Sequence, residues 1–174
     1  MASDQELLSG LWPVSSLLTS GLEDCTELYV LAASARQFLA AHSRWFPEVG
    51  QGWLYRGFAH LAVFLFEVKP DHGADPYVWV VVGDVPPAFI DISCRTGLEA
   101  IESYVFCMRE WAEAVKEGRP VDGLIPVYYR DSTKQIPPDR QFADELNSRL
   151  GMIEHEVMPA WAAADEEGTG RPPA

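Results

Sequence analysis

Five glutamates and one phenylalanine recur in residues 98–117 at spacings that place them on one side of a helix. At about 100° per residue, they fall within an arc of about 80°. They are Glu99, Glu102, Glu110, Glu113 and Glu117, with Phe106 in the middle of the stripe. A large aromatic side chain ringed by carboxylates has the form of an interface hot spot, with an apolar anchor and a charged rim. The stripe predicts a surface that binds a basic protein partner.

The same stripe has a second interpretation, which the residues leave open. Charged runs on helices commonly face solvent without binding anything. In that case Phe106 would be covered by the N-terminal residues 1–22, an irregular arm or one short helix whose apolar side chains include Leu7, Leu8, Leu11, Trp12, Leu17 and Leu18.

A second group of candidate residues lies in two predicted connections. Asp84 follows Gly83 between two apolar runs, where a carboxylate could anchor a ligand or act as a general acid–base group. An aspartate in this position also commonly bonds its own backbone and fixes a turn. Tyr128, Tyr129 and Arg130 form a polar-tipped aromatic cluster that could line a ligand pocket beside a sheet or simply pack on it.

The sequence predicts no catalytic residue, cofactor or metal site. No dinucleotide, phosphate-loop, zinc-protease or serine-hydrolase motif occurs. His60 opens an apolar run and is expected to be a core histidine with its polar atoms satisfied. Cys25, Cys94 and Cys107 are widely spaced and odd in number, which argues against a disulfide framework. Whether the chain is an enzyme stays open, and a non-enzymatic role fits these residues better.

The net charge of the chain limits the classes of partner that it is expected to bind. Its 174 residues include 26 acidic and 13 basic side chains, a net charge of −13. Such a charge repels nucleic-acid phosphates and anionic membranes and attracts basic proteins. The apolar run Leu61–Phe66 is too short to cross a bilayer, and the N-terminus lacks the positive charge of a signal peptide. We therefore expect a cytoplasmic protein that binds neither nucleic acid nor membrane.

The apolar runs predict one α+β domain over residues 1–165 and a disordered tail over 166–174. The apolar run 61–66 within residues 54–68, together with residues 78–82 and 88–92, is expected to form a three-stranded antiparallel meander, and residues 123–129 could add a short strand at an edge. The central runs are apolar at every position, so both sheet faces must be covered. About three helices of the same chain, or a second copy in a homodimer, could cover them.

Three helices are expected from the apolar periodicity. They cover about residues 26–43, 98–117 and 139–157. Thr96 and Glu99 form a capping-box pattern before the second helix, and Gly118 is placed to end it. Pro159 should break or kink the third helix, because proline lacks an amide donor and clashes with the preceding turn.

The stretch Trp79-Val-Val-Val-Gly-Asp-Val-Pro86-Pro87, followed by a helix with Glu-Ala-Ile near its start and Trp111 later, resembles a family of small bacterial proteins. That family carries a W-V-V-V-G-D-x-P motif and is known only as a domain of unknown function. The resemblance covers the two strands and the next helix. It implies a bacterial source and supplies no catalytic residues.

Two functions follow as predictions. The first is a cytosolic protein-interaction module, such as an immunity-type inhibitor, that binds a basic partner through the acidic helix face. The alternative is a small-molecule-binding protein or small enzyme with a pocket beside the sheet. A closed pocket holding two convergent titratable side chains would favour the alternative, and a flat acidic face without a pocket would favour the first.

Overall fold

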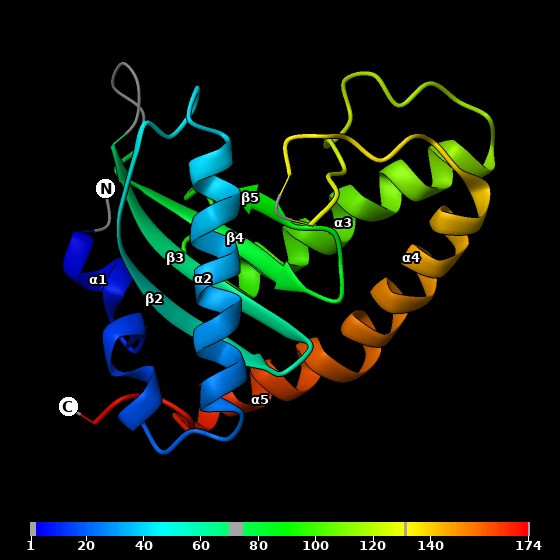
Figure 1. Cartoon of the computed structure of the whole chain (residues 1–174). Helices are drawn as coiled ribbons and strands as arrows, with labels where there is room; N and C mark the ends of the chain where they lie inside the picture. The colour runs from blue at the N-terminus through cyan, green and yellow to red at the C-terminus, as the bar shows by residue number, and fades with distance from the viewer. Residues whose placement is uncertain (1–2, 70–74, 131, 174) are drawn as a thin grey trace.

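Five antiparallel strands in chain order form one sheet, with helices on both of its faces (Figure 1). The computed structural model describes residues 3–69, 75–130 and 132–173. The strands are β1 (Trp12–Pro13), β2 (Glu48–Phe58), β3 (Leu61–Lys69), β4 (Tyr77–Gly83) and β5 (Ala88–Ile90). The helices are α1 (Asp4–Leu8), the 3₁₀ helix η1 (Val14–Thr19), α2 (Cys25–Ala41), α3 (Gly97–Lys116), α4 (Arg140–Met152), the π-helical turn η2 (Ile153–Val157) and α5 (Met158–Glu167). This confirms the predicted α+β class.

Strands β3 and β4 are buried on both faces, as their apolar runs predicted. Successive side chains of a strand point to opposite faces, so Val63 and Leu65 join the core under α3, whereas Phe64 and Phe66 join the core under α2. Helices of the same chain therefore cover both faces, and no second copy is needed for this. Helix α4 packs against α3, beside the sheet.

The sheet has more strands than predicted. The meander of β3, β4 and β5 is confirmed, but the residues before the 61–66 run form an additional strand, β2, which pairs with β3 as a hairpin. Glycines inside β2 interrupt its apolar pattern, which concealed it. Residues 123–129 form no strand; their only pairing in the described chain is an isolated bridge between Tyr128 and Gln135.

The ends of α3 follow the predicted chemistry. The Glu99 amide donates to the Thr96 hydroxyl at 3.1 Å, and the Thr96 amide donates back to the Glu99 carboxylate at 3.3 Å. Gly118 has a φ of +68°, which favours glycine after a helix end. The third predicted helix differs, because Pro159 does not break it. The chain stays helical through the wider η2 turn, which ends just before Pro159.

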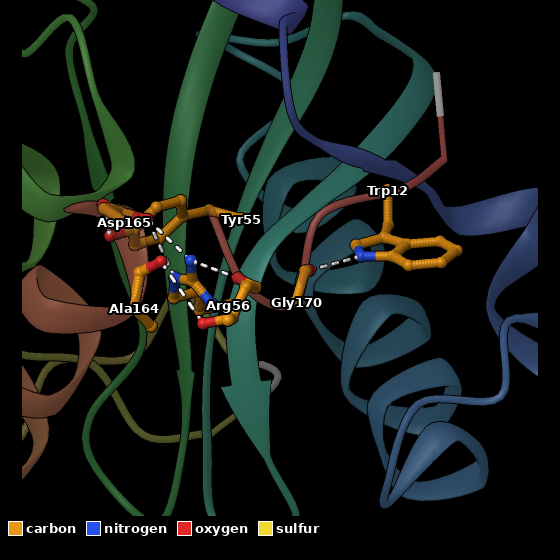
Figure 2. Close-up of polar contacts among 7 residues, drawn as sticks. Trp12, Tyr55, Arg56, Ala164, Asp165 and Gly170 are labelled. Atoms are coloured by element: carbon orange, nitrogen blue, oxygen red, sulfur yellow. Dashed lines mark hydrogen bonds and ion pairs between the residues drawn. The ribbon is translucent and has the colours of Figure 1, made fainter. Parts of the chain in front are cut away.

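The residues near the C-terminus, for which the sequence predicts disorder, contact the rest of the fold in the structure. Glu166 and Glu167 belong to α5, and the residues after them lie against β2 (Figure 2). The indole N–H of Trp12 donates to the Gly170 carbonyl oxygen at 2.7 Å, which ties this segment to the N-terminal region. The described part of residues 166–174, which excludes Ala174, is thus part of the fold.

One ion pair anchors this segment, and we call the group the C-terminal clasp: Tyr55, Arg56, Asp165 and Thr169. Arg56 donates from Nε and Nη2 to one Asp165 oxygen at 3.0 and 2.8 Å, and from Nη2 to the Thr169 carbonyl at 2.8 Å. The Tyr55 hydroxyl donates to the other Asp165 oxygen at 2.6 Å. Because both carboxylate oxygens are bound, Asp165 holds α5 against β2 at two points.

Two glycines provide a matched test of the helix packing. A Cβ at Gly97, the first residue of α3, would collide with the Tyr55 ring, whereas a Cβ at Gly151 in α4 would meet nothing within 4 Å. We expect Gly97→Ala to destabilise the protein by ~1–3 kcal/mol through overpacking, and Gly151→Ala to stabilise it by ~0.5–1 kcal/mol. Urea unfolding followed by tryptophan fluorescence measures both. A Gly97→Ala protein as stable as wild type would contradict the close α3–β2 contact.

The clasp also predicts a loss of stability at high pH. Burial, reinforced by the Asp165 carboxylate, raises the pKa of Tyr55 above its ordinary value. The folded chain therefore holds the phenol proton more tightly than the unfolded chain does. This stabilisation is complete below the ordinary tyrosine pKa of about 10 and is lost as the pH rises above it.

We expect the free energy of unfolding to fall between about pH 8 and pH 10.5, and to fall less in Tyr55→Phe. Burial also raises the pKa of Tyr104, so part of the fall remains in the variant. Urea unfolding at the two pH values measures the difference. An equal fall in both proteins would show that Tyr55 does not contribute.

Candidate functional site

A cavity of about 680 Å³ opens at one end of the sheet, where the β2–β3 turn and the end of β4 lie beside the continuous helix formed by α4 and η2 (Figure 1). Its apolar lining consists of Phe58, Leu61, Val85, Met152, Ile153 and Val157. Its polar lining consists of His60, Asp84, Arg130, Arg149 and Glu156. We call it the sheet-end cavity.

The register of β3 and β4 brings His60 and Asp84 together. Leu61 pairs with Gly83, so the residue before one and the residue after the other lie side by side. The Asp84 amide donates to the His60 carbonyl at 2.8 Å, and the two side chains meet at 2.7 Å between Nδ1 and Oδ2. Gly83 has a φ of +141°, and a Cβ there would collide with the His60 carbonyl. Only glycine allows this approach without strain.

Two arginines from other segments complete the polar side. Arg130 donates from Nη2 to the Gly83 carbonyl at 2.7 Å and lies 3.4 Å from Oδ1 of Asp84. Arg149, on α4, donates from Nη1 to the Asp84 carbonyl at 2.6 Å. Both guanidinium groups are thus held by main-chain oxygens of the β4–β5 connection. This fixes their positions relative to the His60–Asp84 pair.

The π-helical turn η2 supplies part of the opposite wall. It contributes Ile153, Glu156 and Val157 to the cavity. Single π-helical turns within α-helices are rare and occur frequently at functional sites, because the wider turn changes which side chains share a face. The turn is a second, independent feature that singles out this end of the sheet.

The arrangement allows hydrogen bonding at the mouth and apolar contact inside. A carboxylate can only accept, so the Asp84 contact places a proton on Nδ1 of His60 and leaves Nε2 for another partner. Each guanidinium group has five N–H donors, of which the main-chain contacts use few. The site can therefore present several fixed donors to one bound molecule.

Only two of the four residues predicted as an alternative ligand site meet here. Asp84 and Arg130 lie at the cavity, but Tyr128 packs under α2, with its ring 4.6 Å from that of His42, and Tyr129 is exposed beside Lys134. The expectation that Asp84 bonds its own backbone was wrong. Within the described chain, its carboxylate contacts are the side chains of His60 and Arg130.

His60 is the main residue that the sequence placed wrongly. It was expected in the core, but its side chain is 67% exposed in the β2–β3 turn. The error follows from counting His60 as the first residue of the apolar strand, whereas β3 begins at Leu61 and His60 lies in the turn before it. Arg149 and Glu156 were not singled out, and only their spacing beside the apolar stripe of a predicted helix could have drawn attention to them.

The acidic face of α3 is exposed, as predicted, and its aromatic residue is open to solvent. Phe106 is 65% exposed, so the described N-terminal residues do not cover it. A groove of about 210 Å³ runs beside it, lined by Val105, Met158, the stripe glutamates Glu102, Glu110 and Glu113, and the Arg109–Glu154 pair. The stripe thus presents an exposed aromatic side chain beside a shallow groove that carboxylates line.

The other two glutamates of the stripe have local partners. Glu99 accepts from the amides of Arg95 and Thr96 at the start of α3, and Glu117 pairs with Arg119 at 2.6 Å. Arg109, within the stripe, pairs with Glu154 at 2.6 Å. Three of the five predicted glutamates therefore remain as the charged surround of Phe106.

Within residues 3–69, 75–130 and 132–173, His, Cys, Asp and Glu side chains form no group of three that could hold a metal ion. No helix in the same part has the length and apolar character needed to cross a membrane.

Comparison of the chain with protein-family models, curated proteins and solved structures gave no match. The resemblance carried by Trp79–Pro87 therefore stays a prediction. The functional argument rests on the geometry of the two surfaces described above.

Proposed function

We propose that the chain is a small-molecule-binding protein and that its site is the sheet-end cavity. One observation carries this proposal. Four polar side chains from separate segments, His60, Asp84, Arg130 and Arg149, converge on a cavity of about 680 Å³ that also has an apolar wall. Ligand sites are typically concavities of ~300–1,000 Å³, mostly apolar with a few fixed polar groups.

The preorganisation of the polar groups supports this reading. Arg130 and Arg149 are held by main-chain oxygens, and Asp84 is fixed on a connection whose geometry depends on Gly83. A site whose donors are already positioned loses less conformational entropy when a ligand binds. Two titratable side chains, His60 and Asp84, also meet beside the cavity, in an open site and not in the closed pocket that the sequence analysis named.

Filling the cavity should abolish ligand binding without unfolding the protein. Val157 is partly exposed on the cavity wall, and we expect Val157→Trp to place an indole in the cavity. The measurement is a fragment screen by two-dimensional amide NMR. Binding fragments should shift the amides around His60, Asp84 and Met152, and these shifts should disappear in the variant.

The matched control is Val30→Trp, which adds the same side chain to the exposed face of α2, away from the cavity. It should bind fragments as wild type does. Fragments that bind Val157→Trp unchanged, or that shift only residues elsewhere, would contradict the proposal.

A second proposed function rests on Phe106. We propose that the acidic face of α3 binds a basic protein partner, as an immunity-type inhibitor in the cytoplasm would. The observation in favour is that a 65% exposed phenylalanine lies beside a groove and among Glu102, Glu110 and Glu113. The net charge of −13 would speed the capture of a basic partner.

Phe106→Ala tests this second function. Removing an exposed side chain should leave the free energy of unfolding, measured in urea, within ~0.5 kcal/mol of wild type. Partner capture from a lysate should be lost. The readout is a pull-down at low and moderate salt, in which a basic protein retained by wild type weakens as salt rises. Val30→Ala, which truncates a similarly exposed side chain on α2, should capture as wild type does. Equal capture by Phe106→Ala would contradict this function.

A further inference from the structure

We infer that the ligand of the sheet-end cavity is an amphipathic anion, in which one carboxylate-like group binds Arg130 and Arg149 and an apolar body lies on the opposite wall. This inference rests on the proposed small-molecule function and specifies its ligand class. It follows from how the lining residues are divided and from how the charges are paired.

The lining separates into two chemically different sides. The β2–β3 turn, the β4–β5 connection, Arg130 and Arg149 supply the polar side. The buried Leu61 and Ile153 and the exposed Met152 supply the apolar contact, and η2 also places the Glu156 carboxylate among these side chains. A ligand that is polar throughout would leave the apolar wall uncovered, and a purely apolar ligand would cover guanidinium groups without bonding to them.

The charges at the mouth favour an anionic head group. The described groups that face the cavity are His60, Asp84, Arg130, Arg149 and Glu156. The Asp84 carboxylate is already engaged, through Oδ2 with His60 and Oδ1 with Arg130. Arg149 instead bonds a main-chain carbonyl, which carries no charge, so this contact leaves its positive charge unneutralised.

Donors remain on both arginines. Within the described residues, the hydrogen bonds use Nη2 of Arg130 and Nη1 of Arg149, and no partner occurs for Nη1 of Arg130 or Nη2 of Arg149. Guanidinium groups bind carboxylates through two parallel N–H donors, and such charge-assisted bonds are stronger than neutral ones. The formal charges of Arg130 and Arg149 are balanced by Asp84 and Glu156 in the lining, so the preference for an anion rests on the free guanidinium donors.

The test compares four probes that separate head group from tail: decanoate, decanol, decylammonium and acetate. Isothermal titration calorimetry measures their binding to the full chain. Decanoate should bind at least about tenfold more tightly than decanol or decylammonium, because only decanoate can pair with both arginines. Acetate should bind at least about tenfold more weakly than decanoate, because it cannot cover the apolar wall.

Variants assign the head-group site. Arg149→Gln should weaken decanoate about tenfold or more and leave decanol unchanged, since a neutral amide keeps a donor for the Asp84 carbonyl but removes the charge. Arg130→Gln is a second variant with the same expectation, should the first unfold. Arg119→Gln, which removes an exposed arginine paired with Glu117, is the matched control and should bind decanoate as wild type does.

The outcomes distinguish this inference from the proposed function. Equal binding of decanoate and decanol that is lost in Val157→Trp would overturn the anionic class and keep the cavity as a ligand site. Acetate binding as tight as decanoate would reduce the site to a simple anion site and overturn the amphipathic class. Failure of all four probes, with fragments still binding in the cavity, would overturn only the ligand class. Failure of probes and fragments together would overturn both.

Discussion

The antiparallel pairing of β3 with β4 is the interaction on which the rest of this structure depends. Because both strands carry buried apolar side chains on both faces of the sheet, each face must be covered, and α2 and α3 cover one face each. The same pairing sets Leu61 opposite Gly83. It therefore determines both the core and the position of the two connections that hold His60 and Asp84.

Sequence reasoning found the parts of the fold with strong local patterns. The β3–β5 meander, the span of α3 and its capping box were all predictable from hydrophobic periodicity and end chemistry. Strand β2 was missed because its glycines, such as Gly52, break the pattern. The C-terminal segment was missed because its small polar residues are held by distant partners, Arg56 and Trp12, which composition does not show.

The candidate site was predictable only in part, for a related reason. Asp84 and Arg130 could be singled out by residue type, but their meeting with His60 and Arg149 depends on strand register and helix placement. Tyr128 and Arg130 lie two residues apart, yet one packs under α2 and the other reaches the Gly83 carbonyl. The local sequence could not show that the two side chains point to different parts of the fold. The segment that contains them forms no strand, so its side chains follow no fixed alternation.

The π-helical turn links the cavity to the C-terminal clasp through helical phase. A π turn carries one more residue than an α turn, so η2 rotates α5 by about 100° relative to a continuous α-helix. In that phase Trp161 faces the Tyr55 ring and Asp165 meets Arg56. Deleting one residue between Ile153 and Val157 would restore an ordinary helix and turn both contacts away from β2. The extra residue thus determines the rotation of α5 that the clasp needs, and it lies in the same turn that lines the cavity.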